Sequence, residues 1–214
     1  MPRPSVEAQR REQILDAACG VIATAGVANL RMADIAEAAG LSSGTIHYYF
    51  DTKHEVVSAA FEFNLSKSLQ RHRNLLDSGK DALAVLQDLI ESYLPGDEPS
   101  LRAWKVWVAL WAEAVRDPQL QQINEELYSR WRDVVTGVIG NGQQQGLVRP
   151  GDPVQLANML VGMLDGLAVQ VLVHAPSMPL ATMRAICTAF IDSALRAVDH
   201  ASPARVDGST RHAN

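Results

Sequence analysis

The sequence predicts an all-α protein of about nine helices, in which a small N-terminal unit of three helices precedes a larger helical unit. Apolar residues recur at spacings of three and four along nearly the whole chain, which is the period of an amphipathic helix. No stretch alternates convincingly between apolar and polar residues, as a half-buried strand would. Hydrophobic residues make up 47% of the 214 residues, so the chain can bury a substantial core.

The expected helices begin where the apolar period begins and end at residues that stop a helix. Gly26 and Gly40 end the first two long patterns, because glycine adopts a left-handed conformation at little cost. Asp51 or Thr52 caps a long fourth helix, and Pro95 stops the fifth. The expected helices span about 6–25, 32–39, 43–49, 52–76, 80–94, 98–116, 119–141, 153–174 and 179–199.

Three segments follow from this pattern. Residues 1–52 form the small N-terminal unit, and residues 53–200 form the larger helical unit. Residues 201–214 are polar and aperiodic, which predicts a disordered tail.

The segment Val154–Val173 is apolar and close to membrane-spanning length. Polar residues interrupt it on several sides, and they are Gln155, Asn158, Asp165 and Gln170. A helix buried at a protein interface is therefore expected, and a membrane span is not.

Composition and motifs exclude several classes of function. The first thirty residues are rich in charge and lack the apolar region of a signal peptide, which predicts a cytoplasmic protein. Cys19 and Cys187 lie in apolar helical patterns with no partner at metal-ligand spacing. A glycine-rich phosphate loop and a nucleophile elbow are missing as well, so we expect no enzyme, no metal site and no cofactor.

The most specific pattern lies around the end of the second predicted helix. A small residue, Ala36, stands where a crossing helix would pass, and Gly40 supplies a positive φ four residues later. Ile46 follows six residues on and fills the space between two helices, while Ser42 or Ser43 caps the helix that carries it. This spacing predicts a helix-turn-helix whose second helix presents its amino end to a phosphate.

The short helix after this turn carries more polar and aromatic residues than its inward face needs. Only Ile46 and Phe50 are required inside. The residues left partly outward are Thr45, His47, Tyr48 and Tyr49. Tyrosine hydroxyls can reach phosphates and tyrosine rings can contact thymine methyl groups, so this face predicts a DNA-reading surface. The alternative for either tyrosine is packing against a neighbouring helix.

The charge of the chain fits DNA binding only locally. The net charge is −5, and residues 1–55 hold five basic and seven acidic residues. The basic residues nevertheless lie on the N-terminal arm and at the starts of the second and fourth helices, where a duplex would lie. We infer that one N-terminal unit (the head) binds DNA with moderate affinity, so we expect two heads to bind one palindrome.

Residues 35–42 (Ile-Ala-Glu-Ala-Ala-Gly-Leu-Ser) and 44–53 (Gly-Thr-Ile-His-Tyr-Tyr-Phe-Asp-Thr-Lys) resemble the TetR family of repressors, with a close match over about 10–57. The resemblance implies that helices one to three bind DNA, helices four to seven enclose a ligand, and helices eight and nine form a dimer interface. The DNA-contacting positions that it implies are Arg31, Ser42, Ser43, Thr45, His47, Tyr48, Tyr49 and Lys53.

Arg31 departs from the family pattern, which has a threonine or serine that caps the second helix and contacts a phosphate. A longer cation can still reach a phosphate, but the cap must then come from another residue, with Asn29 as the candidate. Lys53 looks like the family's phosphate-contacting lysine.

The C-terminal part resembles the choline-responsive BetI-like subgroup through residues 103–114, 117–120 and 165–167. The candidate ligand-pocket residues are Trp104, Trp107, Trp111, Glu113, Tyr128, Trp131, Met163 and Asp165. Two interpretations stay open. The tryptophans can be ordinary core, with the two carboxylates paired to Arg102, Lys105 or Arg116; or rings and carboxylate together can hold a cationic ligand.

The last two helices, Val154–Val173 and Met178–Ala197, look too apolar for a solvated surface and predict the homodimer interface. The sequence thus predicts a ligand-responsive transcriptional repressor that binds palindromic operator DNA as a homodimer and is released by a small-molecule inducer. The alternative is a helical small-molecule-binding protein with a degenerate DNA-binding head.

Overall fold

The computed structural model describes residues 6–197, with the side chains of residues 73 and 74 left aside. The predicted tail, residues 201–214, lies outside the described residues. Within them the fold is all-α, as predicted. The helices are α1 (Val6–Asn29), α2 (Met32–Ala39), α3 (Ser43–Tyr49), α4 (Lys53–Leu76), α5 (Ala82–Tyr93), α6 (Glu98–Ala114), α7 (Pro118–Gln144), α8 (Pro153–Leu172), α9 (Leu180–Phe190) and the π-helical turn η1 (Ile191–Leu195).

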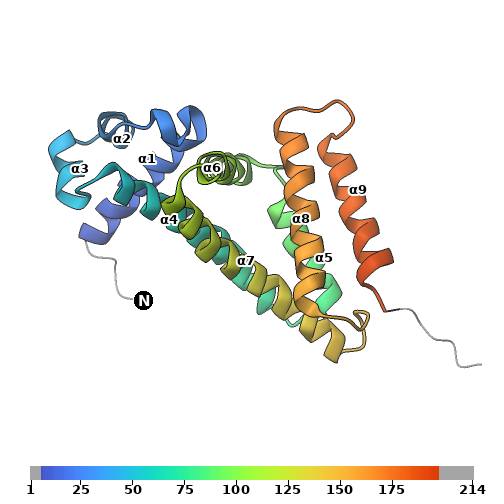
Figure 1. Ribbon diagram of the computed structural model, residues 1–214. Coiled ribbons are helices and arrows are strands. Elements are labelled where there is room, and N and C mark those ends of the chain that lie inside the picture. The colour runs from blue at the N-terminus through green and yellow to red at the C-terminus, as the bar shows by residue number, and fades with distance from the viewer. Residues whose placement is uncertain (1–5, 198–214) are drawn as a thin grey trace, which may run out of the picture.

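The two ends of the molecule carry different helices. Figure 1 shows α1, α2 and α3 gathered at one end, and α8 and α9 side by side at the other. Helices α4 and α7 run between the two ends, and α6 lies next to the N-terminal head. Helix α3 therefore lies exposed at one end of the molecule, and the α8–α9 pair lies at the opposite end.

Local signals explain most of the helix starts. An aspartate precedes each of the four helices α5 to α8, and its carboxylate accepts a hydrogen bond from a backbone amide in the first turn. This bond satisfies an N–H group that has no partner within the helix. These caps are Asp81, Asp97, Asp117 and Asp152. Proline follows closely in α6, α7 and α8, where its fixed φ suits the first turn of a helix.

Two helix ends differ from the expectation. Gly26 (φ 75°) ends the first regular stretch of α1, but one more helical turn follows beyond this kink, up to Asn29. The predicted ninth helix continues through the π-helical turn η1 to Leu195, and it is wrong only beyond that residue, where the chain leaves the helix. There Arg149 N donates to Leu195 O (2.8 Å) and Ala197 N donates to Leu147 O (2.8 Å). This extended pairing with the segment after α7 replaces further helical hydrogen bonds.

One continuous core connects the head to the rest of the chain, with buried side chains from every helix. Both cysteines belong to this core, and the Cys19 thiol donates to Ala60 O (3.3 Å). Burial raises the pKa of the Cys19 thiol to about 12, so it stays protonated at neutral pH.

Helix α1 packs along α6 more extensively than along any other helix. Both terminal nitrogens of the Arg102 guanidinium on α6 donate to the Asp16 carboxylate on α1. The Lys67 ammonium of α4 pairs with the Glu12 carboxylate of α1 in the same way. The head is therefore joined by ion pairs to both α4 and α6.

Helices α8 and α9 turn small and apolar residues outward. Val154 and Met159 are each about half exposed on α8. Gly162 and Gly166 also face outward, and a Cβ added to either would meet no atom within 4 Å. Internal packing therefore does not require glycine there. Among the described residues α8 is the one helix whose length and composition would suit a membrane span, which for a single helix is weak evidence.

Candidate functional site

The turn between α2 and α3 has the geometry that the sequence predicts. Gly40 adopts φ 64° and ψ 35°, the left-handed region that favours glycine. Its amide donates to Glu37 O (3.0 Å), and the Leu41 amide donates to Ala36 O (2.9 Å). Ala36 is buried between the helices, and Ile46 is fully buried beneath α3. The pair α2–α3 is therefore a helix-turn-helix.

Helix α3 presents a polar and aromatic outer face. The Ser42 hydroxyl caps it by accepting from Thr45 N (3.1 Å), which decides between the two predicted caps. His47 is exposed, and Tyr48 is 78% exposed. The ring of Tyr49 meets that of Tyr48 edge to face at 5.1 Å and packs partly against the core, so of the two tyrosines Tyr48 reaches furthest outward.

The basic residues of the predicted contact set are Arg31 and Lys53. Arg31 occupies the N-cap position of α2, is exposed and makes no capping bond. The proposed replacement cap was wrong, because the Asn29 amide donates backwards to Ala25 O (3.0 Å) inside α1. The Lys53 ammonium donates to Ala28 O (3.0 Å), which holds it at the junction of α1 and α4.

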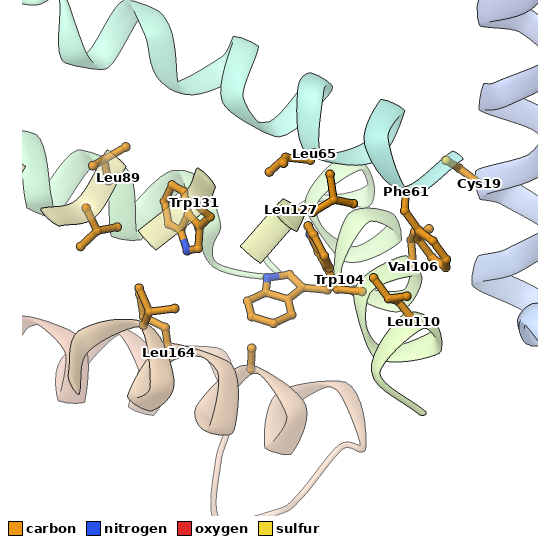
Figure 2. Close-up of a cluster of buried hydrophobic side chains, with 14 of the residues drawn as sticks. Cys19, Phe61, Leu65, Leu89, Trp104, Val106, Leu110, Leu127, Trp131 and Leu164 are labelled. Carbon is orange, nitrogen blue, oxygen red and sulfur yellow. The ribbon is translucent and has the colours of Figure 1, made fainter. Parts of the chain in front are cut away.

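A second site is built from aromatic rings inside the larger unit. We call it the aromatic cluster; it comprises Tyr93, Trp104, Trp107, Trp111, Tyr128 and Trp131. Neighbouring ring centroids lie 4.8 to 6.3 Å apart. Figure 2 shows Trp104 and Trp131 in the layer between α4, which carries Leu65, and α8, which carries Leu164.

A carboxylate lies at the edge of this cluster. The Tyr128 hydroxyl donates to Asp165 Oδ2, whereas Asp165 Oδ1 is buried and accepts no bond from any described residue. Burial raises the pKa of Asp165 to about 6, and the Tyr128 hydrogen bond counteracts part of that rise. Within the described part of the chain Asp165 has no ion-pair partner; Arg132, which lies over the Tyr128 ring, pairs with Glu125.

The structure separates the remaining pocket candidates. Met163 is half-buried against the core. Glu113 lies apart from the rings and lines a hollow between head and body together with Lys53, His54 and Asp117. Arg102, one of the expected ion-pair partners of Glu113 and Asp165, instead forms an ion pair with Asp16.

Two residues of the site were missed from the sequence. Tyr93, at the end of α5, stacks on Trp131 (4.8 Å, 15°) and accepts the Trp104 indole N–H at its backbone oxygen (2.6 Å). His72 lies 5.1 Å from the Trp131 ring and is 1% exposed. No sequence pattern assigns Tyr93 or His72 to this site, because their ring contacts are made with residues of other helices.

The ligand side of the cluster has a testable pH dependence. An Asp165 pKa of about 6, above its ordinary value, means that the carboxylate is mostly neutral at pH 5 and mostly ionised at pH 7. A cation that bound beside Asp165 would favour the ionised form, so its affinity should rise roughly tenfold between pH 5 and pH 7 and then level off. Calorimetric titration with a quaternary ammonium ion across this range measures the effect, and a flat profile would count against Asp165 as the cation's partner.

The fold and these two sites define a helix-turn-helix regulator with a ligand-binding body. Residues 14–60 match the model of bacterial regulatory proteins of the tetR family, and residues 82–196 match that of the C-terminal part of BetI-type transcriptional repressors. The chain belongs to the TetR family and is a transcriptional regulator with BetI-like relatives.

Curated relatives carry the name HTH-type transcriptional regulator BetI. The protein of Stenotrophomonas maltophilia is 32% identical over 126 residues, which are 58% of this chain and 63% of that protein. The protein of Yersinia pestis strain Pestoides F is 31% identical over 136 residues, 60% of this chain and 68% of the relative. The chain thus spans slightly under two thirds of the first relative's length.

Solved structures agree in fold over nearly the whole chain. A putative transcriptional regulator from Saccharomonospora viridis, crystallised in complex with choline, is 32% identical with a TM-score of 0.81, covering 89% of this chain and 99% of that one. A putative TetR-family regulator from Rhodococcus sp. is 24% identical with a TM-score of 0.78, covering 86% and 97%. The second likeness concerns the fold alone.

Proposed function

We propose that this protein is a cytoplasmic repressor that binds a palindromic operator as a homodimer and releases it when a quaternary ammonium ligand binds. The observation that carries the ligand part is Asp165, a buried carboxylate that lies beside aromatic rings and pairs with no cationic side chain of the described residues. A trimethylammonium group is attracted both to such rings and to such a charge. The choline complex of the similar regulator supports the same chemistry.

The head supplies the DNA side of the proposal. An exposed Tyr48 and His47 lie on α3. Arg31 precedes α2, and the Lys53 ammonium lies nearby at the end of α1, on Ala28 O. We assign base-edge contacts to α3 and phosphate contacts to the basic groups and to the capped amino end of α3. Arg31, Ser42, Ser43, Thr45, His47, Tyr48, Tyr49 and Lys53 remain the proposed contact set.

The outward face of α8 and α9 supports a homodimer. Its exposed glycines allow the backbone of another helix to approach closely, and its apolar residues gain by being covered. Binding to two successive major grooves requires that this pairing place both heads on one side of the dimer.

Tight packing of the aromatic cluster explains how ligand binding would release the operator. Tyr93 and Trp131 are stacked at 4.8 Å, so an ammonium group can enter only if rings move apart. Trp104, Trp107 and Trp111 belong to α6, which the Arg102–Asp16 pair ties to α1. Opening the cluster therefore displaces the head, and the ligand acts through its different affinity for the two states.

Selection of bound DNA from a random pool tests this function. We expect a palindrome whose half-sites lie about one helical turn apart. Choline added to the selected complex should release the DNA in a mobility-shift assay. Failure to enrich any sequence would favour the alternative of a small-molecule-binding protein with a degenerate head, whereas tighter binding with choline would contradict release.

A further inference from the structure

A polar stripe on α4 faces the aromatic cluster. Asn64, Ser68 and His72 follow one another at intervals of four and therefore lie on one face of the helix. They are buried, with exposures of 7%, 7% and 1%. We call this set the α4 polar stripe.

Two members of the stripe are bonded to the protein. The Asn64 amide donates to Ala103 O of α6 (3.3 Å), and the Ser68 hydroxyl accepts from Arg71 (3.0 Å). His72 differs, since neither ring nitrogen has a partner among the described residues. A buried polar group without a hydrogen bond lowers the stability of the fold, so internal stability does not explain a histidine at this position.

The protonation state of His72 limits what can bind to it. Burial, and secondarily the neighbouring Arg71, lower its pKa to about 4, so the ring is neutral at pH 7. A neutral imidazole offers one N–H donor and one acceptor nitrogen. A hydroxyl group matches both, whereas an alkyl group matches neither.

His72 borders the aromatic cluster. Its ring lies 5.1 Å from that of Trp131, which stacks on Tyr93. The rings of Tyr93, Trp104, Trp111 and Tyr128 contact one another in that order, and the Tyr128 hydroxyl donates to Asp165. A continuous series of ring contacts therefore connects the carboxylate to His72. We propose that His72 is a specificity-determining residue that hydrogen-bonds a hydroxyl group of the ligand, at the end opposite the ammonium group. This inference rests on the proposed quaternary ammonium ligand.

Two probes that differ only in the hydroxyl test this assignment. Choline carries it, and propyltrimethylammonium carries a methyl group in its place. Calorimetry on the full chain should show that the wild type binds choline at least about tenfold more tightly, because the hydroxyl-free probe leaves His72 unpaired. His72→Phe should reduce this ratio to near one, and His72→Gln, which keeps a donor and an acceptor, should retain part of it.

Trp111→Phe is the matched control. It weakens a ring that would contact the trimethylammonium group of both probes, so both affinities should fall together and the ratio should persist. Thermal unfolding verifies that each variant is folded.

The outcomes separate this inference from the proposed function. Equal affinity of the wild type for both probes, or an unchanged ratio in His72→Phe, would overturn the role of His72 and leave the ammonium ligand in place. No binding of either probe to the wild type would overturn the proposed ligand class and this inference with it.

Discussion

Asp165→Asn should lower the affinity for choline by at least about 30-fold, or about 2 kcal/mol, because it removes the negative charge that a buried cation would face. The substitution keeps the size of the side chain and an oxygen for the Tyr128 hydroxyl. Calorimetric titration at pH 7.5, where the wild-type carboxylate is ionised, measures the loss. A Tyr128→Phe variant keeps the charge and should lose much less.

The same substitution should stabilise the unliganded protein at neutral pH. A pKa of about 6 in the folded state exceeds the ordinary value of 3.8, so the contribution of Asp165 to stability is full below pH 4 and is lost as the pH rises through 6. The asparagine side chain of the variant does not titrate, and its advantage should be about 1–2 kcal/mol above pH 7 and vanish near pH 4. Chemical unfolding at both pH values checks this, and an opposite trend would contradict the burial of a charged Asp165.

Lys53→Ala should weaken operator binding by about 30-fold, since a homodimer loses the contact twice and each hydrogen bond contributes about 1 kcal/mol net. The slope of log affinity against log salt concentration should also fall by about 2, one unit for each phosphate no longer neutralised. Fluorescence anisotropy with the selected duplex, at several salt concentrations, measures both quantities.

The control for this prediction is Lys80→Ala. Lys80 is exposed just beyond the far end of α4, where it pairs with Asp88, so the substitution changes the net charge equally but far from the proposed DNA face. An unchanged salt slope in Lys53→Ala, or an equal change in Lys80→Ala, would remove Lys53 from the contact set.

The head could be predicted from the sequence because its constraints are local. Ala36, Gly40 and Ile46 act within ten residues of one another, and each must have one kind of side chain for the turn to close. The cap of α2 was the exception. Asn29 satisfies a carbonyl of its own helix instead, because one more turn follows the kink at Gly26.

The surroundings of the aromatic cluster were predicted only in part because they join five helices. Tryptophans at spacings of three and four indicate one face of α6, but they do not tell whether a carboxylate from α8 meets them. Asn64, Ser68 and His72 look like a solvated face in sequence, and only the packing of α4 on α6 and α7 shows that they are buried. The end of α9 likewise depends on pairing with a segment distant in the sequence, through the Arg149–Leu195 bond.

Reciprocal coupling between the two sites is the most direct test of a regulator that exchanges DNA for a ligand. Choline binding is measured by calorimetry with the protein free and again with the protein saturated by the selected operator duplex. If both sites bias one conformational equilibrium, the operator must weaken choline binding by the same factor by which choline weakens operator binding. Identical choline affinity in the two titrations would contradict the account.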